Sequence, residues 1–382
     1  MTARDATTPD TGGLGLRHYV LLLAICLFAF LPGISTLPPT DRDESRFVQA
    51  TKQMVETGDY VDIRFQDQPR YKKPAGIYWL QTAAVLASGQ GVDAPIWVYR
   101  LVSVLGGTVS VLAVAWIGAR MFGPTAGLIA GLGLAGIVML GFEARIAKTD
   151  ATLLATALIA QGALARLYLD HRRGLPASRA AAYVFWAAQG AAILVKGPVV
   201  PAVSALTALG LIVLDRDRGW LKGMRPLGGA LLAALIAAPW LAVISYKSGG
   251  AFWRESLGDD FIAKIGSGQE SHGLPPGYYA VIFVLFAWPF APRMLEGGLK
   301  LIGRFRGEPA LLFCLCWYVP YWLLIELVPT KLPHYILPAY PALALAMAWA
   351  LADDGVRDAP LGRWQAWLWR VAAAGFAPVT LV

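Results

Sequence analysis

Charged side chains are scarce in this sequence. Asp, Glu, Lys and Arg make up 15% of its 382 residues, whereas hydrophobic residues make up 57%. A soluble globular domain carries more charge than this, so that class of protein is excluded. Several apolar runs approach the ~20 residues that a helix needs to cross a bilayer, where each backbone polar group must be satisfied without water. The composition therefore predicts an all-α, polytopic membrane helical bundle.

Cysteine is almost absent, and it marks no site. Cys26, Cys314 and Cys316 all lie inside apolar runs, so neither a disulfide framework nor a cysteine metal site is predicted. The sequence also lacks a Walker A lysine loop, an HExxH pair, a GxSxG elbow and a CxxC motif. These absences argue against an ATPase, a zinc protease, a serine hydrolase of that kind and a thiol oxidoreductase.

The net charge of +8 does not indicate a nucleic-acid partner. Lys and Arg cluster in short loops between apolar runs, and they form no basic stripe on a soluble fold. Because cytoplasmic loops carry an excess of Lys and Arg, the loops after the fourth, sixth, eighth and tenth apolar segments are predicted to be cytoplasmic. The alternate loops then face outward.

Ten apolar segments organise the chain, at 19–34, 96–119, 125–141, 151–169, 180–195, 199–214, 227–244, 278–294, 310–328 and 335–351. Residues 1–18 are predicted to be a cytoplasmic segment before an uncleaved first helix; a signal sequence is the alternative. Residues 19–351 form one transmembrane domain with an outer loop at 39–95. Residues 352–382 are expected to hold a cytoplasmic interfacial segment and the start of a truncated helix, because the last stretch is too short to span.

The run at 73–89 is apolar but short, and polar residues flank it. We interpret it as an interfacial helix lying in the plane of the outer leaflet. If it spanned the membrane instead, the loop before it would face away from every other candidate site residue. The arrangement of the site therefore depends on this segment.

The first outer loop is densely charged, with seven acidic and seven basic residues between Pro39 and Lys73. An outward loop with that many positive charges runs against the usual distribution. A functional interpretation is a carboxylate acting as general base beside cations that hold phosphate. The alternative is a solvated loop whose charges balance each other. The pair Asp41-x-Asp43 also matches a metal and nucleotide-sugar motif, but nucleotides are not available on an outer face.

Other outward loops add polar residues with simpler alternatives. Asp150 could serve only as a helix cap, and Lys196 could be a snorkelling lysine at a tight hairpin. His272 could titrate or bind metal, yet a lone loop histidine usually does neither. The motif at 329–335 places Lys331, His334 and Tyr335 together at a Pro-stiffened junction, with Glu326 as a candidate partner of Lys331.

Six motifs together resemble a known family. They are DRDESRF at 41–47, QPRYKKPAGIYWLQ at 68–81, TDATLLA at 149–155, VKGP at 195–198, HGLPPGYY at 272–279 and TKLPHYILPAYPALAL at 330–345. In this order and spacing they resemble glycosyltransferase family 39, the protein O-mannosyltransferase-like superfamily, and within it the bacterial aminoarabinose transferases that modify lipid A. The resemblance implies a GT-C fold with juxtamembrane helices in the first outer loop.

The resemblance also implies roles for individual residues. Asp43 matches the essential acidic residue of the family, with Glu44 and Arg46 as its neighbours. Asp150 matches a second acidic position, so Asp43, Glu44 and Asp150 are the expected catalytic residues. Phe47 stands where many members have Tyr, and the Lys-Pro-Pro motif of the family reads Lys-Pro-Ala at 73–75.

The expected contacts to the donor phosphate come from Arg46, Lys73, Lys331 and Tyr335. Four further residues are expected to line the cavity: Lys72, Lys196, His272 and His334. Lys72 occupies a position that is often acidic in the aminoarabinose enzymes, which argues against a divalent metal beside His272. No cofactor is predicted.

The sequence thus predicts a glycosyltransferase of the bacterial inner membrane that faces the periplasm. Its partners would be a polyprenyl phosphate sugar donor, membrane lipids, and a lipid or glycan acceptor such as lipid A, with transfer by inversion. Alternatives are a lipid or glycolipid transporter or flippase, in which the polar residues line a translocation path, and a protein O-glycosyltransferase.

Overall fold

The computed structural model describes residues 13–40, 42–256, 258 and 273–380. Within these ranges the regular secondary structure is helical except for one antiparallel hairpin of two short strands, in which Arg64 lies opposite Pro69, and an isolated bridge between Gly273 and Thr330. The all-α prediction is confirmed. The elements are α1 (Leu16–Phe30), α2 (Arg42–Thr57), β1 (Arg64–Phe65), β2 (Gln68–Pro69), α3 (Gly76–Ser88), η1 (Gly91–Asp93), α4 (Ile96–Phe122), α5 (Pro124–Gly136), α6 (Val138–Glu143), α7 (Asp150–Arg172), α8 (Arg179–Lys196), α9 (Val199–Leu214), α10 (Trp220–Gly223), α11 (Pro226–Lys247), α12 (Ala251–Trp253), α14 (Tyr278–Phe286), α15 (Ala291–Arg304), η3 (Phe305–Gly307), α16 (Pro309–Leu327), η4 (Pro333–Ala339), α17 (Tyr340–Ala352), α18 (Asp354–Arg357) and α19 (Arg363–Thr380).

Five helical stretches in the described part of the chain are long and apolar enough to cross a membrane. They are α4, α7, α11, α16 and the run Pro333–Ala352, in which α17 follows η4. Three further predicted segments, α1, α5 and α9, are apolar helices of 13–16 residues. The prediction of a multi-pass membrane protein is confirmed, but its ten segments are not ten equal spans.

Two predicted segments are broken helices. The segment at 278–294 divides into α14 and α15 around Pro289, whose nitrogen cannot donate a helical hydrogen bond. The segment at 125–141 divides into α5 and α6 at Ile137, which has an extended backbone with ψ 141°. Apolar composition could not reveal either interruption.

Close helix packing in the bundle depends on small residues. A Cβ atom on Gly106 of α4 would lie 2.7 Å from the backbone nitrogen of Thr152 on α7. A Cβ atom on Gly127 of α5 would lie 2.5 Å from the carbonyl oxygen of Ala115 on α4. Neither gap can hold a side chain. This is the usual means by which membrane helices approach closely where lipid provides no hydrophobic driving force.

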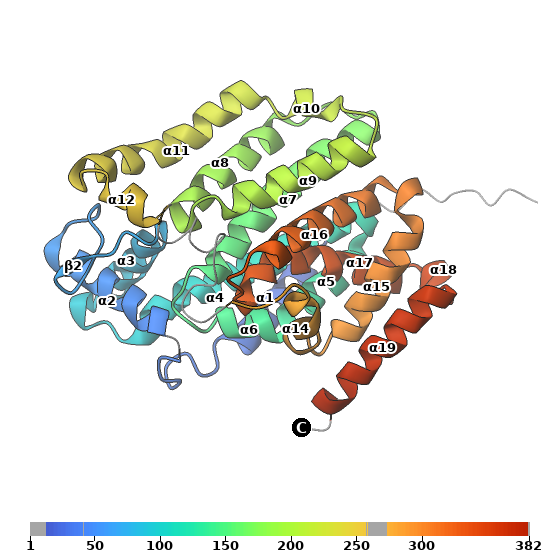
Figure 1. Cartoon of the computed structure of the whole chain (residues 1–382), viewed down its shortest axis with the longest axis horizontal. Helices are drawn as coiled ribbons and strands as arrows, with labels where there is room; N and C mark the ends of the chain where they lie inside the picture. The colour runs from blue at the N-terminus through green and yellow to red at the C-terminus, as the bar shows by residue number, and fades with distance from the viewer. Residues whose placement is uncertain (1–12, 41, 257, 259–272, 381–382) are drawn as a thin grey trace, which may run out of the picture.

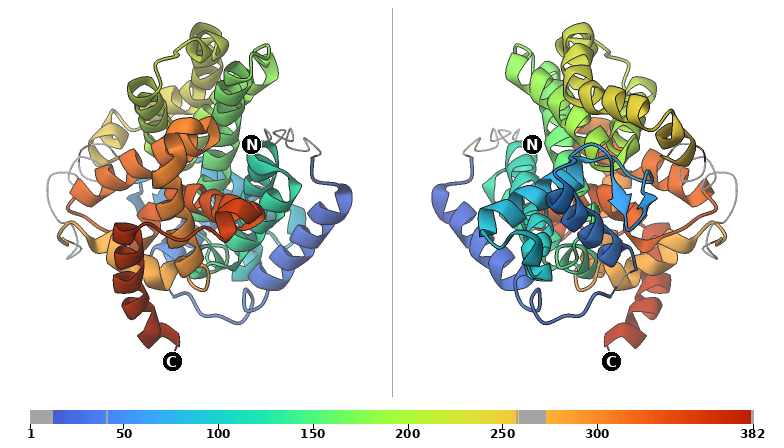
Figure 2. Two further views of the ribbon diagram at one scale, coloured as in Figure 1. Left: turned by 90° about the vertical axis from the view of Figure 1, so that its right-hand side faces the viewer. Right: turned by 90° about the vertical axis from the view of Figure 1, so that its left-hand side faces the viewer.

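The two ends of the bundle carry different elements. Figure 1 shows α2, β2, α3 and α12 together at one end, here called the hairpin end, and α10 and α18 at the other, here called the α10 end. The right-hand view in Figure 2 faces the hairpin end, with α2 and the hairpin in front of the bundle. The predicted first outer loop thus lies at the hairpin end. The two basic loops that contain α10 and α18 lie at the α10 end.

The helices predicted in the first outer loop are present as α2 and α3, which pack together. The Thr51 hydroxyl donates to Oε1 of Gln81 at 2.7 Å, and the rings of Phe47 and Tyr78 are 5.4 Å apart. At ~1.5 Å per residue, the 13 residues of α3 rise only ~20 Å, which is less than the ~30 Å hydrocarbon core. Its length fits the interfacial interpretation, which stays a prediction.

Candidate functional site

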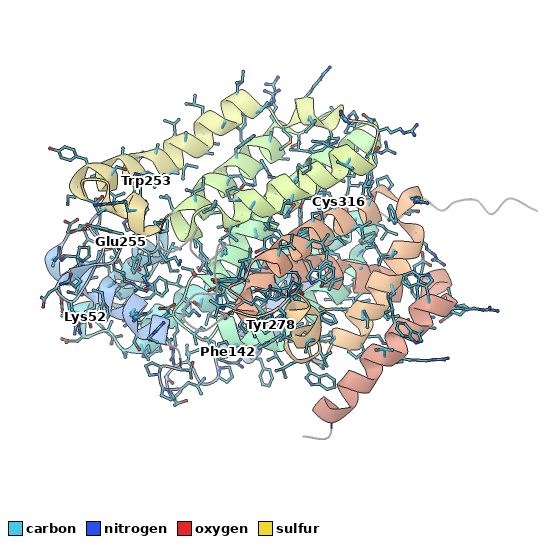
Figure 3. All side chains as sticks on the ribbon, viewed as in Figure 1. Lys52, Phe142, Trp253, Glu255, Tyr278 and Cys316 are labelled. Carbon is cyan, nitrogen blue, oxygen red and sulfur yellow. The ribbon has the colours of Figure 1, made fainter. Side chains whose placement is uncertain are left out.

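A cavity of about 460 Å³ lies towards the hairpin end of the bundle. Its wall comes from the segment before α3, the start of α7, the turn between α8 and α9, α12, α16 and η4. Most of the wall is apolar, with Leu153, Ile193, Leu241, Leu324 and Val328 among its residues. Trp253 belongs to the same wall, and Figure 3 shows it at the hairpin end, above Glu255.

The cavity brings six predicted residues together: Lys72, Lys73, Asp150, Lys196, His334 and Tyr335. They come from four separate parts of the chain, so no single motif indicated that they meet. Three lysines and one aspartate belong to this wall. The polar part of the cavity is therefore suited to an anion, while its apolar part is suited to hydrocarbon.

Asp150 is the centre of a buried charged cluster. It is the first residue of α7, and its Oδ1 accepts a hydrogen bond from Nζ of Lys196, the last residue of α8, at 2.5 Å. His334 lies between two carboxylates, with Nε2 3.8 Å from Oδ1 of Asp150 and Nδ1 3.7 Å from Oε1 of Glu143. Asp150 is thus much more than a helix cap, because it fixes a lysine and a histidine in the cavity wall.

Lys196 has a second contact in the same wall. Its Nζ lies 5.6 Å from the centroid of the Tyr335 ring, within the range of a cation–π interaction. Tyr335 is held in turn by the hydroxyl of Tyr321, which donates to its carbonyl oxygen at 2.9 Å. Tyr321 also lines the cavity, and its position inside an apolar run gave no signal in the sequence.

Asp43 lies in the first turn of α2 and is not among the residues that line the cavity. Its side chain is 47% exposed, and Oδ1 lies 3.3 Å from Nη1 of Arg46 and 3.7 Å from Nη2 of Arg70. The contact with Arg46 joins two residues that the sequence had placed together. Arg70 was not singled out, although it belongs to the QPRYKKPAG stretch that also carries Lys72 and Lys73.

The segment before Lys72 is fixed by Tyr71. The Tyr71 hydroxyl donates to Oδ1 of Asp62 at 2.7 Å. Burial, together with this hydrogen bond to a carboxylate, raises the pKa of Tyr71 to about 12. The phenol therefore stays neutral at physiological pH and keeps its hydrogen bond, which holds the chain just before the two lysines of the cavity.

Glu44, expected to be catalytic, does not line the cavity. Its side chain is fully buried and forms a two-point ion pair with Arg100 of α4, with Nε–Oε1 at 2.7 Å and Nη2–Oε2 at 3.0 Å. The backbone nitrogen of Ala147 donates to the same carboxylate at 2.8 Å. Glu44 thus joins α2 to α4 through Arg100, and its expected catalytic role stays a prediction. The sequence did contain a signal for Arg100 as a partner of Glu44, because Arg100 is a lone charge in an apolar run.

Lys331, expected to bind phosphate, also lies outside the cavity wall. Its side chain is 1% exposed, and Nζ donates to the carbonyl oxygens of Ile325, Glu326 and Val328 at 3.2, 2.7 and 2.8 Å. These donations use all three N–H bonds of the ammonium group. The Glu326 carboxylate is 3.8 Å away, as its predicted pairing requires. Lys331 therefore caps the carboxyl end of α16, and its predicted contact with phosphate stays a prediction.

His272 lies outside the described residues, so its predicted place in the cavity stays a prediction. Among the residues that the structure does describe, no group of three or more His, Cys, Asp or Glu side chains could hold a metal ion.

Comparison with known proteins identifies relatives of this chain. Residues 72–243 match the family model described as dolichyl-phosphate-mannose-protein mannosyltransferase. A curated relative from Aeromonas salmonicida, undecaprenyl phosphate-alpha-4-amino-4-deoxy-L-arabinose arabinosyl transferase, is 26% identical over 341 residues, covering 88% of this chain and 60% of that protein. The chain spans about 60% of the length of such relatives.

Two solved structures share the fold. The crystal structure of ArnT from Cupriavidus metallidurans bound to undecaprenyl phosphate matches with a TM-score of 0.77 and 22% identity, covering 87% of this chain and 60% of that one. The archaeal oligosaccharyltransferase AglB from Archaeoglobus fulgidus matches with a TM-score of 0.62 and 13% identity, covering 94% and 54%. The predicted GT-C fold and the resemblance to glycosyltransferase family 39 and its aminoarabinose transferases are confirmed.

Proposed function

We propose that this chain carries the transfer site of a membrane glycosyltransferase that moves a sugar from a polyprenyl phosphate donor to an acceptor of the bacterial envelope. The observation that carries the proposal is the cavity, in which Lys72, Lys73 and Lys196 share a mostly apolar wall with Asp150 and His334. A polyprenyl phosphate has the matching chemistry, with an anionic head on a long hydrocarbon chain. The related ArnT structure holds undecaprenyl phosphate, which supports this class of carrier.

The lysines would act on the leaving group. When the sugar departs, the bridging oxygen of the carrier phosphate gains negative charge, and fixed cations in an apolar cavity stabilise this charge more strongly than water does. Lys73 and Lys196 both line the cavity. The ion pair with Asp150 holds the Lys196 side chain in place. In this scheme Asp150 is a positioning residue, and no metal is needed to stabilise the leaving group.

Asp43 is our candidate for the general base. The acceptor hydroxyl would attack the anomeric carbon from the face opposite the phosphate, so that a new glycosidic bond forms while the bond to the carrier phosphate breaks, with inversion. The hydroxyl proton would pass to Asp43. Of the two carboxylates, Asp43 is the more accessible, with 47% of its side chain exposed against 4% for Asp150, which is tied to Lys196 at 2.5 Å.

We propose the periplasmic face of the inner membrane as the location and lipid A as the acceptor. The Lys- and Arg-rich loops at the α10 end support a cytoplasmic position for that end, which leaves the cavity facing outward. The relatives that the curated comparison identifies are named for transfer of aminoarabinose from undecaprenyl phosphate, which supports an envelope acceptor.

Two variants on one helix test the role of Asp43. Asp43→Asn keeps the size of the side chain but removes the base, so transfer from a radiolabelled polyprenyl phosphate sugar should fall about 10²–10⁴-fold. Glu56→Gln is the matched control, because Glu56 is another carboxylate of α2, 40% exposed, with a long 3.9 Å ion pair to Lys52. It should transfer normally. Both proteins should elute alike in size-exclusion chromatography. Normal transfer by Asp43→Asn would remove Asp43 from the mechanism.

Mass spectrometry of lipid A, with and without the gene, tests the acceptor. The expected result is one added sugar mass that disappears with Asp43→Asn. An unchanged lipid A would contradict this acceptor and direct the search to proteins and other glycans. If the Asp43→Asn protein moved labelled lipid from one leaflet of a vesicle membrane to the other without sugar transfer, that result would instead support a flippase.

A further inference from the structure

A second hollow lies away from the cavity and shares no residue with it. It has a volume of about 290 Å³ and is lined by three helices: Ala113 and Trp116 of α4, Leu158, Ile159, Gly162, Ala163 and Arg166 of α7, and Ala180, Ala181 and Val184 of α8. It is here called the α7 groove. The helix α7 packs against α4 on one side and α8 on the other. The floor of the groove is therefore α7, and its walls are α4 and α8.

The shape of the α7 groove fits a hydrocarbon chain. Gly162 lets α7 lie close to α4 beside the groove, since a Cβ atom there would lie 3.0 Å from Cγ1 of Ile117 and 3.3 Å from the Trp116 ring. Ile159 and Val184, which belong to the lining, are 38% and 45% exposed, so the groove opens sideways to lipid. From Leu158 to Arg166 it runs roughly 12 Å, close to the ~15 Å thickness of one hydrocarbon leaflet.

Arginines gather at one end of the α7 groove. Arg166 belongs to the lining, and the guanidinium of Arg120 lies 5.3 Å above the Trp116 ring. Nη2 of Arg173 lies 3.4 Å from the carbonyl oxygen of Arg120, and Arg179 begins α8. This is the α10 end of the bundle, because Trp220 of α10 packs against Tyr168 of α7.

The charges at this end are not balanced. Asp170 pairs with Arg166 at 3.4 Å. Within the described ranges, no carboxylate lies within ion-pair distance of Arg120, Arg173 or Arg179. The end of the groove thus has an excess of positive charge, which complements an anionic head group.

We propose that the α7 groove binds one anionic phospholipid from the leaflet at the α10 end. An acyl chain lies along Leu158 and Gly162, and the phosphate contacts Arg166 and Arg120. The apolar lining and the arginines are separate features of the groove. A phospholipid matches both, because it has an acyl chain and a charged head group. The bound lipid joins α4, α7 and α8 along the part of α7 from Leu158 to Arg166, two turns or more from Asp150 at the start of the helix. The proposal does not depend on the chemistry of the cavity.

Native mass spectrometry of the full chain in detergent tests the proposal, with phosphatidylglycerol and phosphatidylethanolamine as probes. Wild type should retain one phosphatidylglycerol in preference to phosphatidylethanolamine. The double variant Arg120→Gln/Arg166→Gln should bind phosphatidylglycerol roughly 30-fold more weakly, since each arginine near the surface contributes about fivefold. The matched control is Arg304→Gln/Arg306→Gln, because Arg304 also stands over a tryptophan, Trp349, at 6.0 Å. It should bind as wild type does.

A second variant tests the acyl chain without changing charge. Ala113→Phe fills the α7 groove and should lower retention of phosphatidylglycerol even if the arginine variant is too unstable to purify. Inorganic phosphate should not displace the lipid, because it has no acyl chain. Equal retention of the two phospholipids by wild type, full retention in both variants, or displacement by phosphate would overturn the proposal.

Discussion

Lys331 has a structural role that its sequence motif did not indicate. Its motif marked it as unusual, and a lysine on the outward side suggested a phosphate contact. In the structure its ammonium group donates to three carbonyl oxygens at the end of α16. Burial lowers the pKa of Lys331, while the nearby Glu326 carboxylate opposes that shift. No N–H bond is left for a ligand.

Lys331→Met and Lys73→Met should therefore have different effects. Lys331→Met leaves three buried carbonyl groups without their donor, which should cost about 1–3 kcal/mol of stability and lower the melting temperature. Lys73→Met should raise the KM for the polyprenyl phosphate donor, because Lys73 lines the cavity. Thermal unfolding and donor titration of the two purified proteins make the comparison. A raised donor KM for Lys331→Met with normal stability would restore its phosphate-binding role.

At the scale of elements, α2 depends on one ion pair. The carboxylate of Glu44 and the guanidinium of Arg100 are both fully buried and meet at two points. Nη1 of Arg100 also donates to the carbonyl oxygens of Ile34 and Leu37, each at 2.8 Å. One side chain of α4 thus holds both the end of the segment after α1 and the start of α2, where Asp43 lies.

Removing one member of this pair should lower the stability of the protein more than removing both. Arg100→Met leaves the Glu44 carboxylate buried without its cation, which should cost about 3–5 kcal/mol. The double variant Glu44→Met/Arg100→Met removes both charges and should be more stable than Arg100→Met alone. Melting temperatures of the wild type, both single variants and the double variant give the coupling between the two residues.

Activity in the same variants separates positioning from catalysis. If Glu44 only positions α2, the double variant should recover part of the sugar transfer that Arg100→Met loses, in parallel with its stability. A double variant that is stable but shows no transfer at all would contradict this, and would return Glu44 to the catalytic residues.

The sequence predicts elements well where composition decides them. The all-α class, the helices of the first outer loop and the ninth segment, found as α16, follow from apolar runs and their polar flanks. The break at Ile137 does not, because no residue there marks it, and the break at Pro289 follows from a single proline that apolar composition ignores. Contacts such as Glu44 with Arg100, 56 positions apart, require the packed bundle. The sequence could therefore single out charged residues, but it could not show which of them line the cavity and which are buried in the bundle.

At the scale of the whole molecule, the two ends have distinct chemistry. The hairpin end carries the cavity with its lysines, and the α10 end carries arginines around the α7 groove. The family motifs predicted Lys72, Lys73, Asp150, Lys196, His334 and Tyr335 for one site because they come from relatives that share the fold. The α7 groove had no such guide, since its small residues and single arginines look like ordinary helix positions in the sequence.

Single cysteines test how these ends lie in the membrane. Asp67→Cys and Gln90→Cys are exposed positions before and after α3, and Arg218→Cys is exposed near α10. If α3 lies flat, a membrane-impermeant maleimide should label Asp67→Cys and Gln90→Cys from the periplasm and Arg218→Cys only after lysis. The three native cysteines are buried and should add little background. Labelling of Asp67→Cys and Gln90→Cys from opposite sides would mean that α3 crosses the membrane, which would separate Asp43 from the outward-facing polar segments.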